Sequence, residues 1–110
     1  MTELDAEDNK LVVLARGAMA RSESDQGAAV RDTDGRTYAA GVVALSSLRL
    51  SALQAAVAAA LSSGAEGFEA AVLFGGSADD DGVTALREVS AGARVVVTGR
   101  DGTLLEVHDG

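Results

Sequence analysis

The sequence predicts a layered α/β domain in which helices cover both faces of one mixed, five-stranded sheet. Apolar residues recur at helical spacing near the N-terminus, and several short apolar runs are bounded by glycine and aspartate, as strands are. Helical and strand-like segments also alternate along the 110 residues. Such alternation is typical of α/β domains, so we expect a three-layer α/β/α arrangement with the element order α-β-β-α-β-α-β-β.

The first predicted helix runs from Lys10 to Arg21, where apolar residues recur every three or four positions and form one stripe. Two strands follow, at residues 27–31 and 37–43. The pair Asp34-Gly35 lies between them, and glycine accepts the positive φ that a tight turn demands. We therefore expect a hairpin here.

The next predicted helix is unusually apolar. It has N-cap candidates in Ser46 and Ser47, runs to Ser63 and ends at Gly64. Its polar residues before position 62 are Arg49, Ser51 and Gln54. Because a helix of this composition is poorly suited to a wet surface, we expect it at the centre of the fold or against another subunit.

The C-terminal half continues with strands and one more helix. Residues 68–74 are predicted to form a buried strand, 83–91 a short helix, and 94–98 and 103–107 two further strands. The aspartates at 79–81 lack the ligand spacing of an EF-hand, so we interpret them as a turn that caps the following helix.

Composition limits the classes of function. The net charge is −8 at pH 7, with an isoelectric point near 4.4, which disfavours contact with nucleic acid or an anionic membrane. The absence of cysteine excludes disulfides and thiolate metal sites. Residues 1–9 carry no apolar run, so we expect a flexible polar lead rather than a signal peptide, one domain over residues 1–110, and a cytoplasmic location.

Framework residues distributed from about Leu11 to Val107 resemble the small homo-oligomeric cytidine deaminases. The segments that carry the resemblance include Gly27-Ala28-Ala29-Val30, Asp34-Gly35-Arg36, Tyr38 to Val42, Phe68 to Val72 and Arg94 to Thr98. The resemblance implies the cytidine deaminase-like fold. It also implies association into a homodimer or homotetramer, because family members complete their sites with neighbouring subunits.

The resemblance further implies a zinc site that this chain cannot build. Family members open the central helix with Cys/His-Ala-Glu and the next helix with Pro-Cys-x-x-Cys. Three of these residues hold zinc, which activates water, and the Glu transfers protons. The matching positions here are Ser51 and Leu53 for the first ligand and the acid, Val83 and Leu86 for the two cysteines, Val43 and Leu45 for the ribose-binding Asn-x-Glu, and Ser24 for a substrate-stacking Phe. We therefore expect no zinc, no other cofactor and no deamination by the zinc mechanism.

Three functions stay open at this stage. The first is a catalytically inactive cytidine deaminase-like protein that acts as an oligomeric interaction or regulatory module, binding itself or another protein. The second is a protein that binds a nucleoside-like or more apolar small molecule in a remodelled pocket lined by Val43, Leu45, Leu53, Val83 and Leu86, although we expect these side chains simply to fill the space. The third is a hydrolase that homology would label a cytidine deaminase; the sequence shows no acid, base or nucleophile constellation for it.

Overall fold

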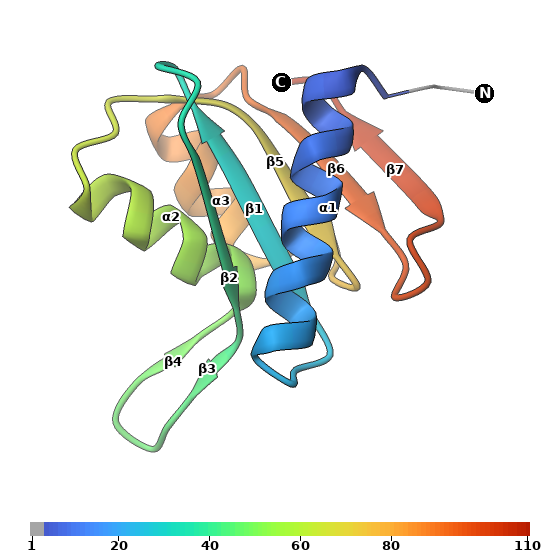
Figure 1. Cartoon of the computed structure of the whole chain (residues 1–110). Coiled ribbons are helices and arrows are strands. Elements are labelled where there is room, and N and C mark those ends of the chain that lie inside the picture. Colours follow the sequence, from blue (N-terminus) through green and yellow to red (C-terminus); the bar gives the residue numbers. More distant parts are fainter. Residues whose placement is uncertain (1–3) are drawn as a thin grey trace.

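Two helical layers enclose the sheet in the computed structural model, which describes residues 4–110. The elements in chain order are α1 (Ala6–Arg21), β1 (Gly27–Asp32), β2 (Thr37–Gly41), β3 (Val43–Ala44), β4 (Arg49–Leu50), α2 (Ala52–Ser62), β5 (Phe68–Phe74), α3 (Asp81–Val89), β6 (Arg94–Thr98) and β7 (Leu104–His108). The main sheet has the order β2-β1-β5-β6-β7 (Figure 1). Its β5–β6 pair is parallel and its other pairs are antiparallel. The predicted α/β/α class with a mixed five-stranded sheet is confirmed.

Each face of the sheet has its own hydrophobic core, because successive strand residues point to opposite faces. Ala28 and Val30 of β1 face α2 and α3, whereas Ala29 between them faces α1. The cores consist mainly of Ala, Val and Leu. Small side chains of this kind allow helices to approach the sheet closely.

The first helix begins earlier than the sequence predicted. The side chain of Asp5 accepts a hydrogen bond from the backbone N–H of Asp8 at 2.8 Å, which caps a helix that starts at Ala6. Asp8 is buried. The prediction of a flexible polar lead is therefore wrong for residues 6–9, and residues 1–3 lie outside the described part of the chain.

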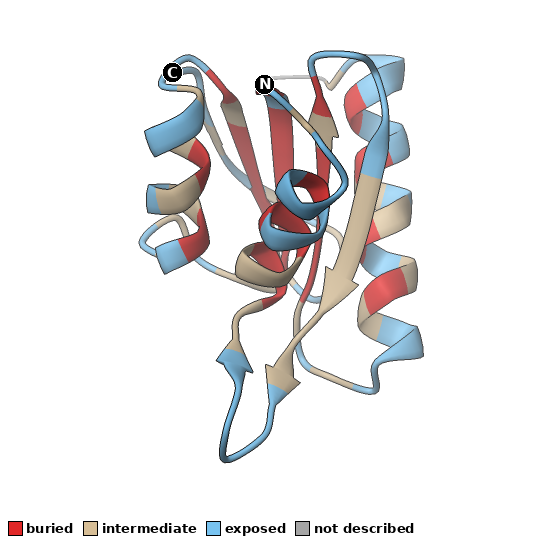
Figure 2. Cartoon of the chain, turned by 90° about the vertical axis from the view of Figure 1, so that its left-hand side faces the viewer, coloured by how far each residue is buried: buried red, intermediate tan, exposed pale blue. Residues whose placement is uncertain are grey.

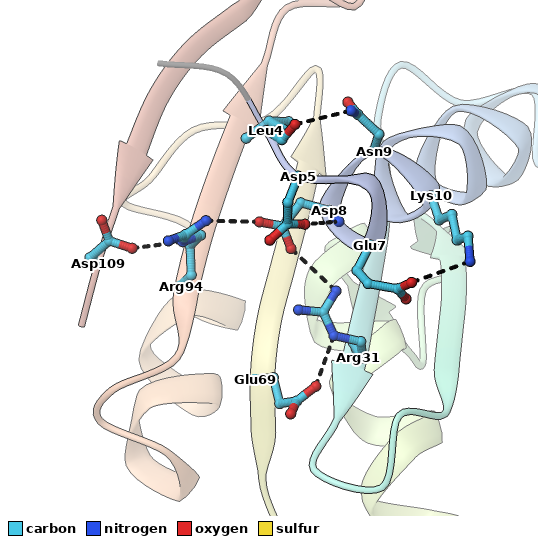
Figure 3. Close-up of polar contacts among 10 residues, drawn as sticks. All are labelled: Leu4, Asp5, Glu7, Asp8, Asn9, Lys10, Arg31, Glu69, Arg94 and Asp109. Carbon is cyan, nitrogen blue, oxygen red and sulfur yellow. Dashed lines mark hydrogen bonds and ion pairs between the residues drawn. The ribbon is translucent and has the colours of Figure 1, made fainter.

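A network of ion pairs explains why a charged residue is buried in this helix (Figure 3). Oδ1 of Asp8 lies 3.2 Å from Nη1 of Arg31, and its Oδ2 lies 3.0 Å from Nη1 of Arg94. Arg31 also pairs with Glu69 at 2.8 Å, and Arg94 with Asp109 at 2.7 Å. Burial alone would lower the pKa of Arg31, but its hydrogen bonds to Glu69 and Asp8, together with the negative charges of these carboxylates, outweigh burial and raise it. The network joins α1 to β1, β5, β6 and the C-terminal end.

A projecting hairpin replaces the predicted start of the central helix. Ser46 and Ser47 lie in the turn between β3 and β4, which pair antiparallel outside the main sheet. The predicted element order is therefore wrong at this point, since two short strands stand before α2. The hairpin extends beyond the layers of the fold, as Figures 1 and 2 show.

The central helix is covered on one side only. Its buried residues, Ala52, Leu53, Ala56, Val57 and Ala60, face the sheet and α3. Its opposite side is exposed to solvent. Figure 2 shows this side on the helix that lies in front of the sheet. Of the two expected positions, the centre of the fold is therefore wrong for the single chain, and a position against another subunit stays a prediction. No helix in residues 4–110 combines the length and the apolar character that crossing a membrane requires.

Replacing Asp8 should destabilise the fold more than replacing a carboxylate of the same network at the surface. The substitution Asp8→Ala removes a buried carboxylate that pairs with both Arg31 and Arg94, so we expect a loss of about 3 kcal/mol. The control is Asp109→Ala, because the Asp109 side chain also pairs with Arg94 but is 70% exposed. It should cost no more than about 0.5 kcal/mol. Urea unfolding measures both, and equal effects would contradict a structural role for the buried carboxylate.

Candidate functional site

The first turns of α2 and α3 meet at one place, where sequence reasoning put the two degenerate motifs. Ser51 caps α2, since its Oγ accepts the N–H of Gln54 at 3.1 Å. The same Oγ donates to Oδ1 of Asp80 at 2.7 Å. That carboxylate oxygen also accepts the N–H of Gly82 at 2.7 Å and thereby caps α3. A single oxygen thus links the two helix N-termini.

The prediction that the aspartate turn caps the following helix is confirmed for Asp80. Its bond to Ser51 was not predicted, because 29 residues separate the two. Asp80 is therefore the residue of this site that sequence reasoning missed.

Leu53 and α3 pack together without intervening space. A Cβ added to Gly82 would lie 2.7 Å from Cβ and Cγ of Leu53 and 2.8 Å from the backbone N of Gln54. Leu53 and Leu86 are both fully buried in the core beneath α2 and α3, and Val83 packs against the same core. The motif positions on these two helices are therefore occupied by close apolar packing.

The other predicted site positions lie elsewhere. Val43 is half-buried at the base of the hairpin, whereas Leu45 is 58% exposed at its tip. The prediction that Leu45 shares a pocket with Leu53 and Leu86 is therefore wrong. Ser24 lies in the loop after α1, and its Oγ donates to the backbone oxygen of Gln26 at 2.7 Å.

An open cleft of about 350 Å³ lies beside Ser51, between the hairpin base and the body of the fold. It is lined by Asp25, Gln26, Val42, Val43, Ala44, Arg49, Leu50, Ser51 and Gln54. Its polar groups are a carboxylate, two amides, a hydroxyl and a guanidinium, which can bind and orient a ligand. Val83 instead lines a separate cavity of about 160 Å³ with Arg87 and His108.

The donor set does not fit zinc. Zinc in proteins is held by cysteine, histidine or carboxylate groups, and a catalytic site supplies three of them. Here Ser51 offers a hydroxyl already bonded to Asp80, and Val83 and Leu86 offer no donor. Across residues 4–110, no group of three or more His, Cys, Asp or Glu side chains is placed to hold a metal ion.

Comparison with known proteins identifies the family. A family model described as cytidine deaminase-like matches residues 4–102. The chain therefore belongs to the cytidine deaminase-like family, as the framework residues indicated. A search of curated protein sequences finds no match.

Solved structures agree with this fold. The cytidine deaminase of Burkholderia pseudomallei superimposes with a TM-score of 0.79 at 21% identity, over 99% of this chain and 93% of that one. The cytidine deaminase of Mycobacterium leprae gives 0.70 at 20% identity, over 96% and 94%. A mutant cytidine deaminase from Mycobacterium tuberculosis gives 0.65 at 25% identity, over 87% and 86%.

Removing the hydroxyl that joins the two helices should cost stability. The substitution Ser51→Ala deletes the N-cap of α2 and leaves Asp80 without one donor, so we expect a loss of about 1–2 kcal/mol. The control is Ser46→Ala, at the exposed serine that the sequence also offered as an N-cap, with an expected change within about 0.5 kcal/mol. Thermal and urea unfolding compare them. A larger effect at Ser46 would contradict the observed start of α2.

Proposed function

We propose that this cytidine deaminase-like protein has no deaminase activity and acts as an oligomeric protein-interaction or regulatory module. The observation that carries the proposal is the packing of Leu53 against Gly82, at the place where the family motif would supply a proton-transferring acid. An aliphatic side chain can neither bind a metal nor move a proton.

The remaining polar groups do not replace the lost chemistry. Hydrolytic deamination needs an activated water and a group that transfers protons between that water and the base. The hydroxyl of Ser51 is held by Asp80, and both also cap helices. His108, the one histidine of the chain, lies in β7, where its Nε2 is 3.0 Å from Oε1 of Glu106. Neither Ser51 nor His108 is therefore placed to activate a water molecule in the way that a hydrolase requires.

The association expected from the family resemblance is part of this proposal. A homodimer or homotetramer would cover the exposed side of α2, which the fold leaves bare. A different protein that bound to this exposed side would also cover it, and such binding would serve a regulatory role. We also propose that the protein is cytoplasmic. We propose that it binds neither nucleic acid nor a membrane.

The open cleft beside Ser51 favours a second candidate, a small-molecule binding protein. Its lining combines polar side chains, including Asp25 and Arg49, with apolar ones such as Leu50, which suits a ligand with both polar and apolar parts, such as a nucleoside. Native mass spectrometry of the purified protein tests this candidate. A co-purifying small molecule released on unfolding would support it, and a bare polypeptide mass would count against it.

Introducing cysteines at the positions that match the family's zinc ligands tests whether these positions can form a metal site. The substitutions Ser51→Cys, Val83→Cys and Leu86→Cys should create a thiolate site that binds about one equivalent of Co²⁺ with the absorption of tetrahedral coordination. The wild-type chain should show no such band and form no uridine from cytidine in the presence of zinc.

The control replaces Val83→Cys with Leu45→Cys, because Leu45 lies at the hairpin tip and should not complete the site. Far-UV circular dichroism verifies that each variant is folded. Zinc-dependent uridine formation by the wild-type chain would overturn the proposal. Equal Co²⁺ binding by both variants would overturn the assignment of the ligand positions.

A further inference from the structure

A small cavity of about 160 Å³ lies where α3 approaches the strands β6 and β7. It is a different place from the cleft beside Ser51, since the two have no lining residue in common. An engineered protein cavity of about 150 Å³ holds benzene, so this one has room for about six non-hydrogen atoms. Its lining residues are Ala78, Val83, Arg87, Val95 and His108.

Three of the five lining side chains are small and apolar. Ala78 and Val83 are half-buried and pack against the core beneath α2 and α3, and Val95 is fully buried. These side chains offer no hydrogen bond to a ligand. They therefore favour a ligand with an aliphatic body, because polar groups placed against them would lose water without gaining a partner.

Arg87 brings a guanidinium to this apolar cavity. Its Nη2 donates to the backbone oxygen of Ala93 at 3.2 Å and to that of His108 at 3.3 Å, which holds the group in place. Its Nε is buried and has no hydrogen-bond partner among residues 4–110. A charged donor in this state is stabilised by an acceptor, and most strongly by an anionic one.

The described part of the chain does not supply that anion. None of the ion pairs formed within residues 4–110 includes Arg87. The carboxylate of Glu106, on the same strand as His108, pairs with Nε2 of His108 at 3.0 Å instead. The imidazole is thereby engaged and acts as a wall of the cavity.

We propose that this cavity binds a short-chain carboxylate, such as isobutyrate, through the guanidinium of Arg87. The aliphatic part of the ligand would lie against Ala78, Val83 and Val95. The site goes beyond the proposed function, because neither the interaction role nor the cleft beside Ser51 requires it. A ligand held here would also add contacts between α3 and the strands β6 and β7.

Charge and size favour this class over other small molecules. Arg87 would repel a cation. A neutral apolar molecule could fill the cavity but would leave the guanidinium without an anionic acceptor. A phosphate would bring several strongly hydrated oxygens against the apolar walls, where they would find no donor. A monovalent anion with a small aliphatic body satisfies both the cation and the walls.

An NMR titration of the ¹⁵N-labelled protein with isobutyrate tests the proposal. At an ionic strength of about 0.15 M, charges more than about 8 Å away are largely screened, so the net charge of −8 contributes little. We expect saturable shifts of the backbone signals of Val83 and Arg87, with a dissociation constant on the order of 1 mM for so small a ligand. Isobutyramide, a neutral molecule of the same shape, should bind at least about 10-fold more weakly.

A first pair of variants tests the role of the guanidinium. Arg87→Met keeps a long side chain without the charge and should weaken isobutyrate binding at least about 10-fold. The control is Arg36→Met, which removes an exposed guanidinium between β1 and β2 and should bind like the wild type. Far-UV circular dichroism verifies that both variants are folded.

A second pair leaves Arg87 in place, so the test does not depend on the folding of the Arg87→Met variant. Ala78→Leu puts a larger side chain into the cavity and should also weaken binding at least about 10-fold. Its control is Ala58→Leu, at an exposed alanine of α2, which should bind like the wild type.

Saturable binding that is lost in Ala78→Leu and kept in both controls would support the site. The absence of saturable shifts up to tens of millimolar isobutyrate would overturn it. Equal affinity for isobutyramide would overturn the role of the carboxylate, and so would unchanged binding by a folded Arg87→Met variant. Equal losses in the cavity variants and their controls would show binding elsewhere on the chain and overturn the assignment of the cavity.

Discussion

The contact between the N-termini of α2 and α3 is the constraint on which the rest of this structure depends. Oδ1 of Asp80 accepts hydrogen bonds from Ser51 and Gly82, and the missing side chain of Gly82 lets Leu53 pack against the backbone of α3. This contact holds together the two helices that cover one face of the sheet. It also involves Ser51 and Leu53, the positions at which the family resemblance implies a zinc ligand and an acid. The stability of the scaffold and its proposed lack of catalysis therefore have the same physical origin.

The opposite face of the sheet is covered by α1, which is held by ion pairs rather than by contacts between helix N-termini. There α1 is joined to the strands by the buried carboxylate of Asp8 between Arg31 and Arg94. Both faces are thus tied down by contacts made within the chain. The hairpin of β3 and β4 and the outer side of α2 stay exposed, and Arg49 is the one charged residue from position 42 to 63. The same fold that closes the motif positions therefore leaves an apolar surface available for association, the role we propose.

The sequence predicted the sheet and the three helices because their apolar spacing is local. It misplaced the start of α1, since Asp8 is buried only through arginines 23 and 86 residues away. It extended α2 into the hairpin of β3 and β4 because an apolar run after two serines resembles a capped helix. A local signal did mark the true start: Ser51 and Gln54 have the spacing of a capping box, which the structure contains. The link from Ser51 to Asp80 had no such signal, because it joins residues brought together only by the packing of α2 on α3.

The most direct test of the closed motif positions is the effect of Gly82→Ala on the free energy of unfolding. A helical Gly→Ala change normally stabilises by about 0.5–1 kcal/mol, and Gly17→Ala in α1 should do so, since its Cβ would meet only the end of the flexible Arg21 side chain at 3.0 Å. At Gly82 the new Cβ meets Leu53 and backbone, so we expect a loss of about 2 kcal/mol. Opposite signs for the two substitutions in urea unfolding support the account. A stabilising or neutral Gly82→Ala would show room between the helices and contradict it.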